Sequence, residues 1–322
     1  MSKRELLARV LSASGLGWLL RRLPSWEGLL VLNYHRIGEG RATRRDPWDP
    51  DLVSASAEEL DAQLRFFKAE LDVIHADDLP TALKSRGRFA QITFDDGYRD
   101  GFEVAFPVLR ANGVSATFFV TSGFLDHGGV PWWDELAWMT RPRQEGPAAS
   151  DSWRKALHAL DRACGVLGDP EREAFLDSVG ATSGLGRCPR DEGRDLWMTW
   201  DMVRALERGG MTIGGHTSTH PRLSRLSPAR QLEEIAGGKA RIEAEIGKPI
   251  QLFAYPFGAP TCFDAASRAA VKEAGFTHAY SQFGGFQPRG TADPLALKRV
   301  AIETWQSHQL HAATASAPFV FA

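Results

Sequence analysis

The sequence predicts an α/β fold, a distorted (β/α)7 barrel with a helical insertion after the third barrel strand. Three observations lead to this fold class. Seven short apolar runs alternate with segments of helical periodicity, several of these runs end on unusual polar residues, and a stretch at about 128–196 has helical patterns without a strand-like run. Strands that alternate with helices form parallel β/α units, which pack as a closed or nearly closed barrel.

The expected strands are short and apolar. They lie at 29–34, 91–94, 116–120, 211–216, 252–257, 277–282 and 295–302. The helices between them are predicted at 57–69, 102–112, 228–246 and 263–274. Gly113 follows the second helix as an ordinary C-terminal stop, and Ser227 with Pro228 opens the third as an N-cap and a first-turn proline.

We therefore expect one barrel over residues 29–310 and a C-terminal tail over 311–322. The insertion at about 128–196 opens with the sequence VPWWDELAWM and continues with helical patterns. Because it follows the third strand and has no strand-like run of its own, we interpret it as an extension of that loop rather than as a separate domain.

Residues 1–28 are expected to hold an amphipathic helix. Its longest apolar run, at about 16–20, is too short for a signal-peptide core or a membrane span. Three alternatives stay open: the helix packs on the barrel, rests on a membrane surface, or is disordered. Without an export signal we expect a cytoplasmic protein, held at the inner membrane by residues 1–23 in the second alternative. The apolar stripe consists of Leu6, Leu7, Val10, Leu11, Leu19 and Leu20.

The composition is that of a globular protein and excludes several function classes. Among 322 residues, 43% are apolar and 24% are charged. The net charge of −2 provides no field that would recruit nucleic acid, so we expect no nucleic-acid partner. The three cysteines, Cys164, Cys188 and Cys262, form no C-x-x-C motif and indicate neither a disulfide framework nor a thiolate zinc site.

The second predicted strand ends on two adjacent carboxylates, Asp95 and Asp96, in the stretch QITFDDG. Neighbouring negative charges repel, and each loses solvation when it is buried. Asp-Asp-Gly is ordinary turn chemistry, so the pair fits a loop. It also fits a metal site, in which a cation removes the repulsion.

Polar residues at the ends of the other strands favour the metal site. The carboxyl ends of parallel barrel strands share one face, where the chemistry of such barrels takes place. His216 and His220 are four residues apart, so that one helical turn would bring both rings to the same side. Two histidines and a remote carboxylate are a common set of ligands for zinc and also accept cobalt, nickel, iron or manganese. The residues expected to converge are His35, Asp95, Asp96, His216, His220 and the run 255–258.

Three motifs resemble those of a known family. TFDDG at 93–97 and HTSTH at 216–220 are similar to the first two signature motifs of polysaccharide deacetylases, and YPFG at 255–258 resembles the third. These proteins have the NodB-homology fold of carbohydrate esterase family 4. The resemblance covers about residues 29–305 apart from the insertion. It implies a distorted (β/α) barrel of about seven strands, in agreement with the strands predicted above.

The resemblance also implies the roles of the motif residues. Asp96, His216 and His220 would bind the metal, most simply zinc, and Asp95 would be the general base toward water. Backbone N–H groups in the YPFG run, which consists of Tyr255, Pro256, Phe257 and Gly258, would stabilise the oxyanion. The implied reaction is removal of an N-acetyl group from an amino sugar of a polysaccharide, an oligosaccharide or a lipid-linked saccharide.

The sequence departs from the family pattern at two positions. The arginine that orients the base in many members is replaced by Ala254, and Arg299 is the candidate to take its place, although a salt bridge at the barrel rim is an alternative. The late histidine that supplies the general acid has no clear counterpart. His35 is our candidate for the acid, because it resembles the Tyr-His of members acting on poly-N-acetylglucosamine; a structural histidine is the alternative.

Other functions fit the same motifs. The metal and water chemistry would also serve a deformylase or an amidase acting on another C–N bond, and the Ala254 departure leaves a non-catalytic glycan-binding barrel as a further reading. Trp132 and Trp133, with Trp138, lie on the loop after the third strand. They are candidates to stack on sugar rings, or alternatively to anchor the core of the insertion.

Overall fold

The computed structural model describes residues 2–23, 25–38, 46–141 and 147–322. A nine-stranded sheet forms its centre, in the order β10-β1-β5-β6-β7-β8-β9, with β11 beside β1 and β4 beside β5. All pairings in this sheet are parallel except the one between β1 and β10. The main-sheet strands are β1 (Gly28–Tyr34), β4 (Asp72–Val73), β5 (Arg88–Phe94), β6 (Thr117–Val120), β7 (Thr212–Gly215), β8 (Leu252–Ala254), β9 (His278–Tyr280), β10 (Gln287–Pro288) and β11 (Val300–Ala301).

The sheet curls into a distorted barrel, as the sequence predicts. Its two ends approach each other because β11 pairs with β1 and a parallel bridge joins Tyr280 of β9 to Leu297. The seven expected strands correspond to β1, β5, β6, β7, β8, β9 and β11, so the predicted fold class is confirmed. Each of β1, β5, β6, β7, β8 and β9 is mostly or wholly buried, which explains why these strands are continuous apolar runs.

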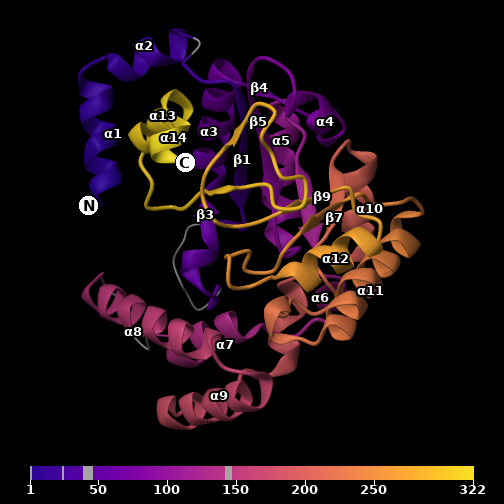
Figure 1. Cartoon of the computed structure of the whole chain (residues 1–322). Helices are drawn as coiled ribbons and strands as arrows, with labels where there is room; N and C mark the ends of the chain where they lie inside the picture. Colours follow the sequence, from indigo (N-terminus) through magenta and orange to yellow (C-terminus); the bar gives the residue numbers. More distant parts are fainter. Residues whose placement is uncertain (1, 24, 39–45, 142–146) are drawn as a thin grey trace.

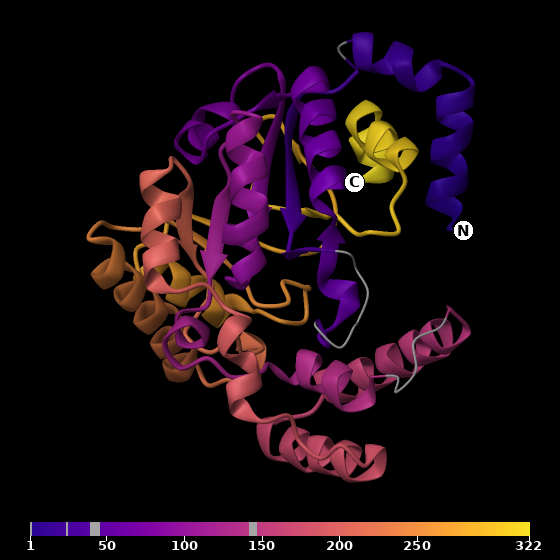
Figure 2. The same cartoon turned by 180° about the vertical axis from the view of Figure 1, so that it is seen from behind.

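Helices cover the outside of the sheet (Figures 1 and 2). Their apolar stripes join the strands in the main core; Leu60, Leu64 and Phe67 of α3, for example, are fully buried there. A capping box of Ser56 and Glu59 starts α3. The helices outside the insertion and the termini are α3 (Ala57–Glu70), α4 (Leu79–Ala82), α5 (Phe106–Ala111), α6 (Ser122–His127), α10 (Trp200–Arg208), α11 (Pro228–Ile246) and α12 (Ala265–Glu273).

The helix expected at 102–112 is not regular throughout. Its first turn, Gly101–Ala105, is a π-turn that continues into α5. Pro107 has no N–H with which to bond the carbonyl of Glu103 in α-helical geometry, so the wider turn avoids an unmet α-helical bond at that carbonyl.

The insertion is helical, and it extends from the edge of the barrel where the parallel strands end (Figure 1). Its own core contains Leu136, Trp138, Leu157 and Leu176. It consists of α7 (Trp132–Thr140), α8 (Pro147–Gly165), α9 (Asp169–Ser183) and a 3-10 helix at Arg190–Asp195. A small separate sheet, β2 (Arg36–Ile37) with β3 (Val53–Ala55), lies next in the chain after β1.

The N-terminal segment forms two helices where a single one was expected. Gly15 adopts a left-handed backbone conformation with φ of 71° and separates α1 (Lys3–Ala13) from α2 (Leu16–Arg22). Both pack against α13 (His308–Ser316), which precedes the short α14 (Pro318–Phe321) (Figure 1). Within the described residues, no helix combines the length and the hydropathy needed to cross a bilayer.

Candidate active site

Asp95 is held by a buried arginine from the other end of the chain. At the end of β5, its two carboxylate oxygens accept hydrogen bonds of 2.7 Å from Nη1 and Nη2 of Arg299. Arg299 precedes β11 and is 1% exposed. Burial alone would raise the pKa of the Asp95 carboxyl, but the adjacent guanidinium holds that pKa below its ordinary value. Asp95 is therefore ionised and fixed in one orientation.

Asn33 of β1 completes the support of this pair. Its side-chain oxygen accepts a 2.7 Å hydrogen bond from Arg299 Nη1, and its Nδ2 lies 3.3 Å from Asp95. Thr93 donates a further bond of 2.7 Å to the same Asn33 oxygen, and Arg299 Nε donates to the carbonyl of Ser281. The sequence did not point to Asn33, although a fully buried amide within an apolar strand is a signal that could have drawn attention to it.

Asp96 faces two histidines. Its Oδ1 lies 3.3 Å from Nε2 of His216 and 3.3 Å from Nε2 of His220, and the three ligand atoms lie within 4.8 Å of one another. His216 Nδ1 donates a 2.7 Å hydrogen bond to the carbonyl of Ala254. With its proton on Nδ1, neutral His216 points the lone pair of Nε2 toward the carboxylate. Such a set of facing acceptors fits a divalent cation between them.

The electrostatics of this cluster also fit a cation. Burial would raise the pKa of Asp96, but hydrogen bonding to the two histidines holds that pKa well below its ordinary value. Burial lowers the pKa of His220, whereas Asp96 and Asp95 outweigh burial and raise the pKa of His216. Metal ligation needs an ionised carboxylate and unprotonated imidazole nitrogens, so a bound cation would replace the proton that His216 otherwise attracts.

The two histidines are brought together by an irregular loop. The expected helical turn over 216–220 was wrong: after β7 the chain is non-helical, with left-handed φ values of 65° at Thr217 and 59° at His220. The Thr217 hydroxyl accepts a 3.0 Å hydrogen bond from the backbone N–H of His220 and thereby fixes the loop. Asp96 also has a left-handed φ, of 74°. Strained backbone of this kind is concentrated at functional sites.

The YPFG run lies beside the cluster and leaves one backbone donor free. The N–H of Tyr255 bonds the Tyr280 carbonyl, Pro256 has none, and the N–H of Gly258 bonds the Pro256 carbonyl. Among the described residues, the N–H of Phe257 has no acceptor. Gly258 has φ of 58°, and a Cβ there would meet the Gln282 nitrogen at 2.4 Å, so only glycine fits.

Asp95, Arg299 and the cluster of Asp96 with the two histidines line one cavity of about 200 Å³. His35 lies on its wall, and its backbone N–H bonds the hydroxyl of Ser54 at 3.0 Å. The predicted site residues that line the cavity are His35, Asp95, Asp96, Trp132, Trp133, His216, His220, Tyr255, Phe257 and Arg299.

Comparisons with known proteins identify the family and the fold. The sequence model of the polysaccharide deacetylase family matches residues 83–279. The chain belongs to the polysaccharide deacetylase family. The predicted activity class, hydrolysis of carbon–nitrogen bonds in N-acetyl groups, is the one that this family carries.

Solved structures show the same fold. The structure is similar to the deacetylase PplD of Streptococcus pyogenes, with a TM-score of 0.59 and 17% identity over 87% of this chain and 94% of that one. It is also similar to IcaB from Ammonifex degensii, with a TM-score of 0.58 and 18% identity over 92% of this chain and 98% of that one. A third similar structure is that of a de-N-acetylase from Aggregatibacter actinomycetemcomitans. Its TM-score is 0.58, and its identity is 19% over 87% of this chain and 97% of that one. A comparison with curated protein sequences gave no significant match.

In this deacetylase the insertion contributes directly to the site wall. Trp133 is 7% exposed, and its ring centroid lies 5.0 Å from that of His220. Its Nε1 donates a 2.9 Å hydrogen bond to the Tyr98 oxygen, and Tyr98 donates one of 2.7 Å to the buried Asp134. Asp134 also accepts a 2.8 Å bond from the backbone N–H of Asp49. This relay fixes the indole of Trp133 against the metal-site loop.

Replacing Tyr98 by Phe is expected to lower the free energy of unfolding by about 1–3 kcal/mol, because a buried carboxylate and an indole N–H both lose a partner. KM for an oligosaccharide should rise as Trp133 loses its fixed orientation, whereas the metal content should not change. Tyr34→Phe is a matched control, since its hydroxyl bonds Gln63 away from the cavity. Denaturation curves and KM values test this; an equal rise of KM in both variants would contradict the relay.

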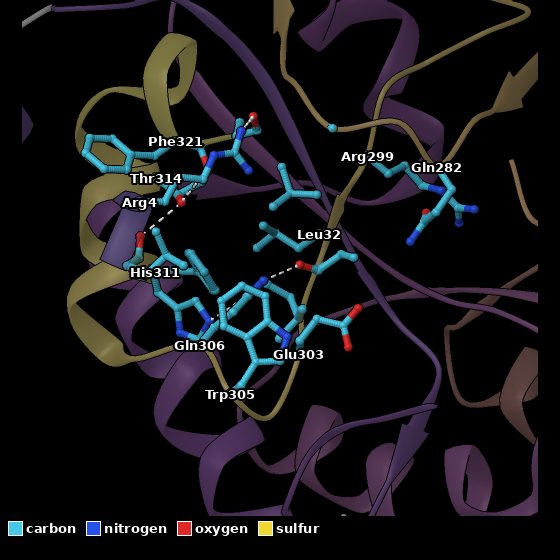
Figure 3. Close-up of a pocket in the computed structure, with 17 residues that line it drawn as sticks. Arg4, Leu32, Gln282, Arg299, Glu303, Trp305, Gln306, His311, Thr314 and Phe321 are labelled. Carbon is cyan, nitrogen blue, oxygen red and sulfur yellow. Dashed lines mark hydrogen bonds between the residues drawn. The ribbon is translucent and has the colours of Figure 1, made fainter. Parts of the chain in front are cut away.

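A second cavity, of about 240 Å³, lies between the terminal helices and the barrel (Figure 3). Arg299 and Gln282 line both cavities, so they form the wall between them. Glu303, which also lines the second cavity, is partly buried. Burial, and to a smaller degree the negative charge of Asp51, raises the pKa of the Glu303 carboxyl to about 7.

This pKa gives a pH-dependent contribution to stability. Because the folded chain holds the Glu303 proton more tightly than the unfolded chain, the contribution is complete below the ordinary pKa near 4.5 and is lost as the pH rises to about 7. Glu303→Gln should therefore be more stable than the wild type at pH 8, with a smaller difference at pH 5. Thermal unfolding at the two pH values tests this, and a difference that does not change with pH would contradict it.

The sequence missed some residues of the deacetylase site. Asp49, Asp161 and Gln282 also line the cavity that Asp95, Asp96 and the two histidines line. Asp49 lies on the loop between β2 and β3, and Asp161 lies on α8 of the insertion. Neither belongs to a motif, and only the packing of the insertion against the barrel brings them to the site.

Proposed function

We propose that this chain is a metal-dependent deacetylase that removes N-acetyl groups from amino sugars of a polysaccharide, an oligosaccharide or a lipid-linked saccharide. One observation carries the proposal. An ionised, arginine-held carboxylate, Asp95, lies next to a buried cluster of two histidines and a carboxylate in a single cavity. Such a pair of carboxylates, one to bind a cation and one to accept a proton, is what amide hydrolysis by water needs.

Asp96, His216 and His220 would hold the metal. A divalent cation there supplies a Lewis acid that polarises the acetamide carbonyl and acidifies water. Two imidazoles and one carboxylate favour zinc, and cobalt, nickel, iron or manganese also accept this set. Metal analysis of the purified protein, followed by activity after reconstitution, identifies the ion. Full activity with magnesium alone would contradict the assignment of nitrogen ligands.

Asp95 would accept the proton of the attacking water. The bidentate pair with Arg299 keeps the carboxylate ionised and its position fixed, so Arg299 takes the part of the base-orienting arginine that Ala254 cannot supply. The free N–H of Phe257 would donate to the carbonyl oxygen as negative charge develops on it. His35, on the same cavity wall, would protonate the departing amine.

The insertion would provide sugar-binding surface. Trp133 is buried and hydrogen-bonded, which favours a structural part for it, whereas Trp132 is only partly buried. The rings of Trp132 and Trp133 are inclined at 83°, so they cannot present parallel faces to one sugar chain. Trp132 is therefore the better candidate for stacking on a sugar ring beside the cavity.

Trp132→Ala is expected to raise KM for an N-acetylglucosamine oligomer by about tenfold, because one aromatic stacking contact is lost. KM for a monosaccharide analogue should change much less, since a single sugar occupies only the metal site. Trp138→Ala is a useful comparison, because this buried residue belongs to the core of the insertion and does not line the cavity. An equal rise of KM for the oligomer and the monosaccharide analogue would show that Trp132 has only a packing role.

The central experiment measures acetate release from N-acetylglucosamine oligomers by the purified chain. We expect release that a chelator abolishes and that added zinc restores. A panel of N-acyl substrates separates this function from a deformylase or an amidase. A non-catalytic glycan-binding barrel would bind the oligomer without releasing acetate; the complete ligand set disfavours this alternative.

A further inference from the structure

The N-terminal helix α1 leaves most of its large apolar side chains exposed. Leu7 and Val10 are 54% and 58% exposed, and Leu6 is exposed as well. The residues that α1 buries are instead Glu5 and Ala8. This arrangement reverses the usual one, in which an amphipathic helix turns its large apolar side chains toward the core.

Specific polar contacts hold the helix in this orientation. The carboxylate of Glu5 accepts hydrogen bonds of 3.0 Å and 2.8 Å from the backbone N–H and the hydroxyl of Ser307, the N-cap of α13. Ala8 is completely buried in a small cluster with Leu310 and Ala313 of α13. Leu6 and Leu7 therefore face outward because Glu5 and Ala8 face α13, whereas Leu11 packs against the same cluster. Figure 1 shows α1 beside α13.

Helix α2 repeats the pattern. It buries Gly17, whose carbonyl accepts a 3.1 Å hydrogen bond from Ser316 of α13. A Cβ at Gly17 would lie 3.3 Å from the Leu11 side chain, so a small residue is required on this side. Around it, Leu16, Trp18 and Leu19 are exposed, and the exposed Leu23 follows the helix. Thus both helices bury a small residue, Ala8 or Gly17, and leave several large apolar side chains in solvent.

Basic residues predominate around this surface, although Arg21 is paired with Glu70 at 3.2 Å. The first 23 residues contain five basic residues and one acidic residue, Glu5, which is buried against Ser307. Arg22 lies over the Trp18 ring at 4.9 Å from its centroid, which places a cation beside an exposed aromatic side chain. The basic residues are Lys3, Arg4, Arg9, Arg21 and Arg22.

We propose that α1 and α2 form a docking surface for the anionic face of a lipid bilayer. Exposed leucines with a Trp, flanked mainly by basic side chains, are the pattern of a helix that lies in the membrane interface. A second copy of the chain fits less well. In a two-fold dimer the same face meets itself, and the basic residues Lys3, Arg9 and Arg22 would be brought close to those of the other copy. The surface is separate from the metal site, so this proposal does not depend on the proposed function.

Vesicle binding by the chain of residues 1–322 tests the proposal. We expect the partition coefficient to be at least about tenfold higher on phosphatidylcholine vesicles that contain phosphatidylglycerol than on phosphatidylcholine alone, and to fall with salt. Leu7→Glu combined with Trp18→Glu should lower binding about tenfold or more, because it places charges in the apolar face. Arg9→Gln should lower it roughly fivefold, which corresponds to one basic residue near an anionic surface.

Val166→Glu is the matched control, because Val166 is 57% exposed in the insertion and its variant should bind vesicles as the wild type does. Circular dichroism and acetate release from a soluble substrate verify that each variant is folded. The proposal would be overturned if the partition coefficient did not change with the Leu7 and Trp18 substitutions, or if it were the same on anionic and neutral vesicles. A wild-type dimer in light scattering that Leu7→Glu converts to a monomer would also overturn it, since the face would then be a contact between copies.

Discussion

Replacing Asp95 by Asn is expected to reduce acetate release by about 10²- to 10⁴-fold, the range that a positioned general base contributes. The substitution keeps the shape of the side chain and an oxygen that can accept from Arg299, but it removes the group that takes the proton from water. Because Asp96, His216 and His220 are unchanged, the metal content of the variant should equal that of the wild type. Steady-state kinetics and metal analysis on the same preparation provide the measurement.

Asp100→Asn is the matched control for this experiment. Asp100 is another carboxylate of the same segment held by an arginine, Arg36 at 2.9 Å, but it does not line the cavity. Its variant should retain turnover within a small factor, even if its stability falls. Turnover by Asp95→Asn that matches the control would show that another group accepts the proton, and the mechanism would have to be abandoned.

Arg299→Met is expected to lower the free energy of unfolding by about 3–5 kcal/mol, because it leaves the buried carboxylate of Asp95 without its counter-charge. Acetate release at neutral pH should fall together with stability. The pKa of Asp95 would rise without the guanidinium, so that less of the base would be ionised. The pair buries Arg299 to 1% and Asp95 to 4% exposure, so solvent does not screen this effect.

A double variant separates the two consequences. Asp95→Asn with Arg299→Met removes both charges and should recover part of the stability lost in Arg299→Met, but none of the activity. Arg289→Met is the surface control, because its ion pair with Glu27 is partly exposed and should contribute only about 0–1 kcal/mol. Chemical denaturation measures the free energy of unfolding of the wild type, Arg299→Met, the double variant and Arg289→Met. Equal stability of Arg299→Met and Arg289→Met would contradict the buried pair.

The fold class and the site motifs could be predicted because they depend on local sequence. Strands that are buried on both faces are continuous apolar runs, and their parallel arrangement sends every strand's carboxyl end to the same face. The residues after those ends, His35, Asp95, Asp96, His216 and His220, could therefore be expected together before any contact was known. The irregular loop that carries His216 and His220 could not be predicted, because left-handed residues other than glycine have no reliable sequence signature.

What the sequence determined by itself is thus the order of strands and helices, the family and the chemical types of the site residues. The sequence left two alternatives for Arg299, a partner of the base or a salt bridge at the barrel rim, and only the tertiary structure shows its partner. Arg299, 204 positions from Asp95, pairs with it because β11 lies against β1, which lies against β5. The tertiary structure also decided the outward orientation of Leu6 and Leu7 in α1. A helical stripe predicts which residues share a face, but Glu5 and Ser307, far apart in the chain, determine which face turns inward.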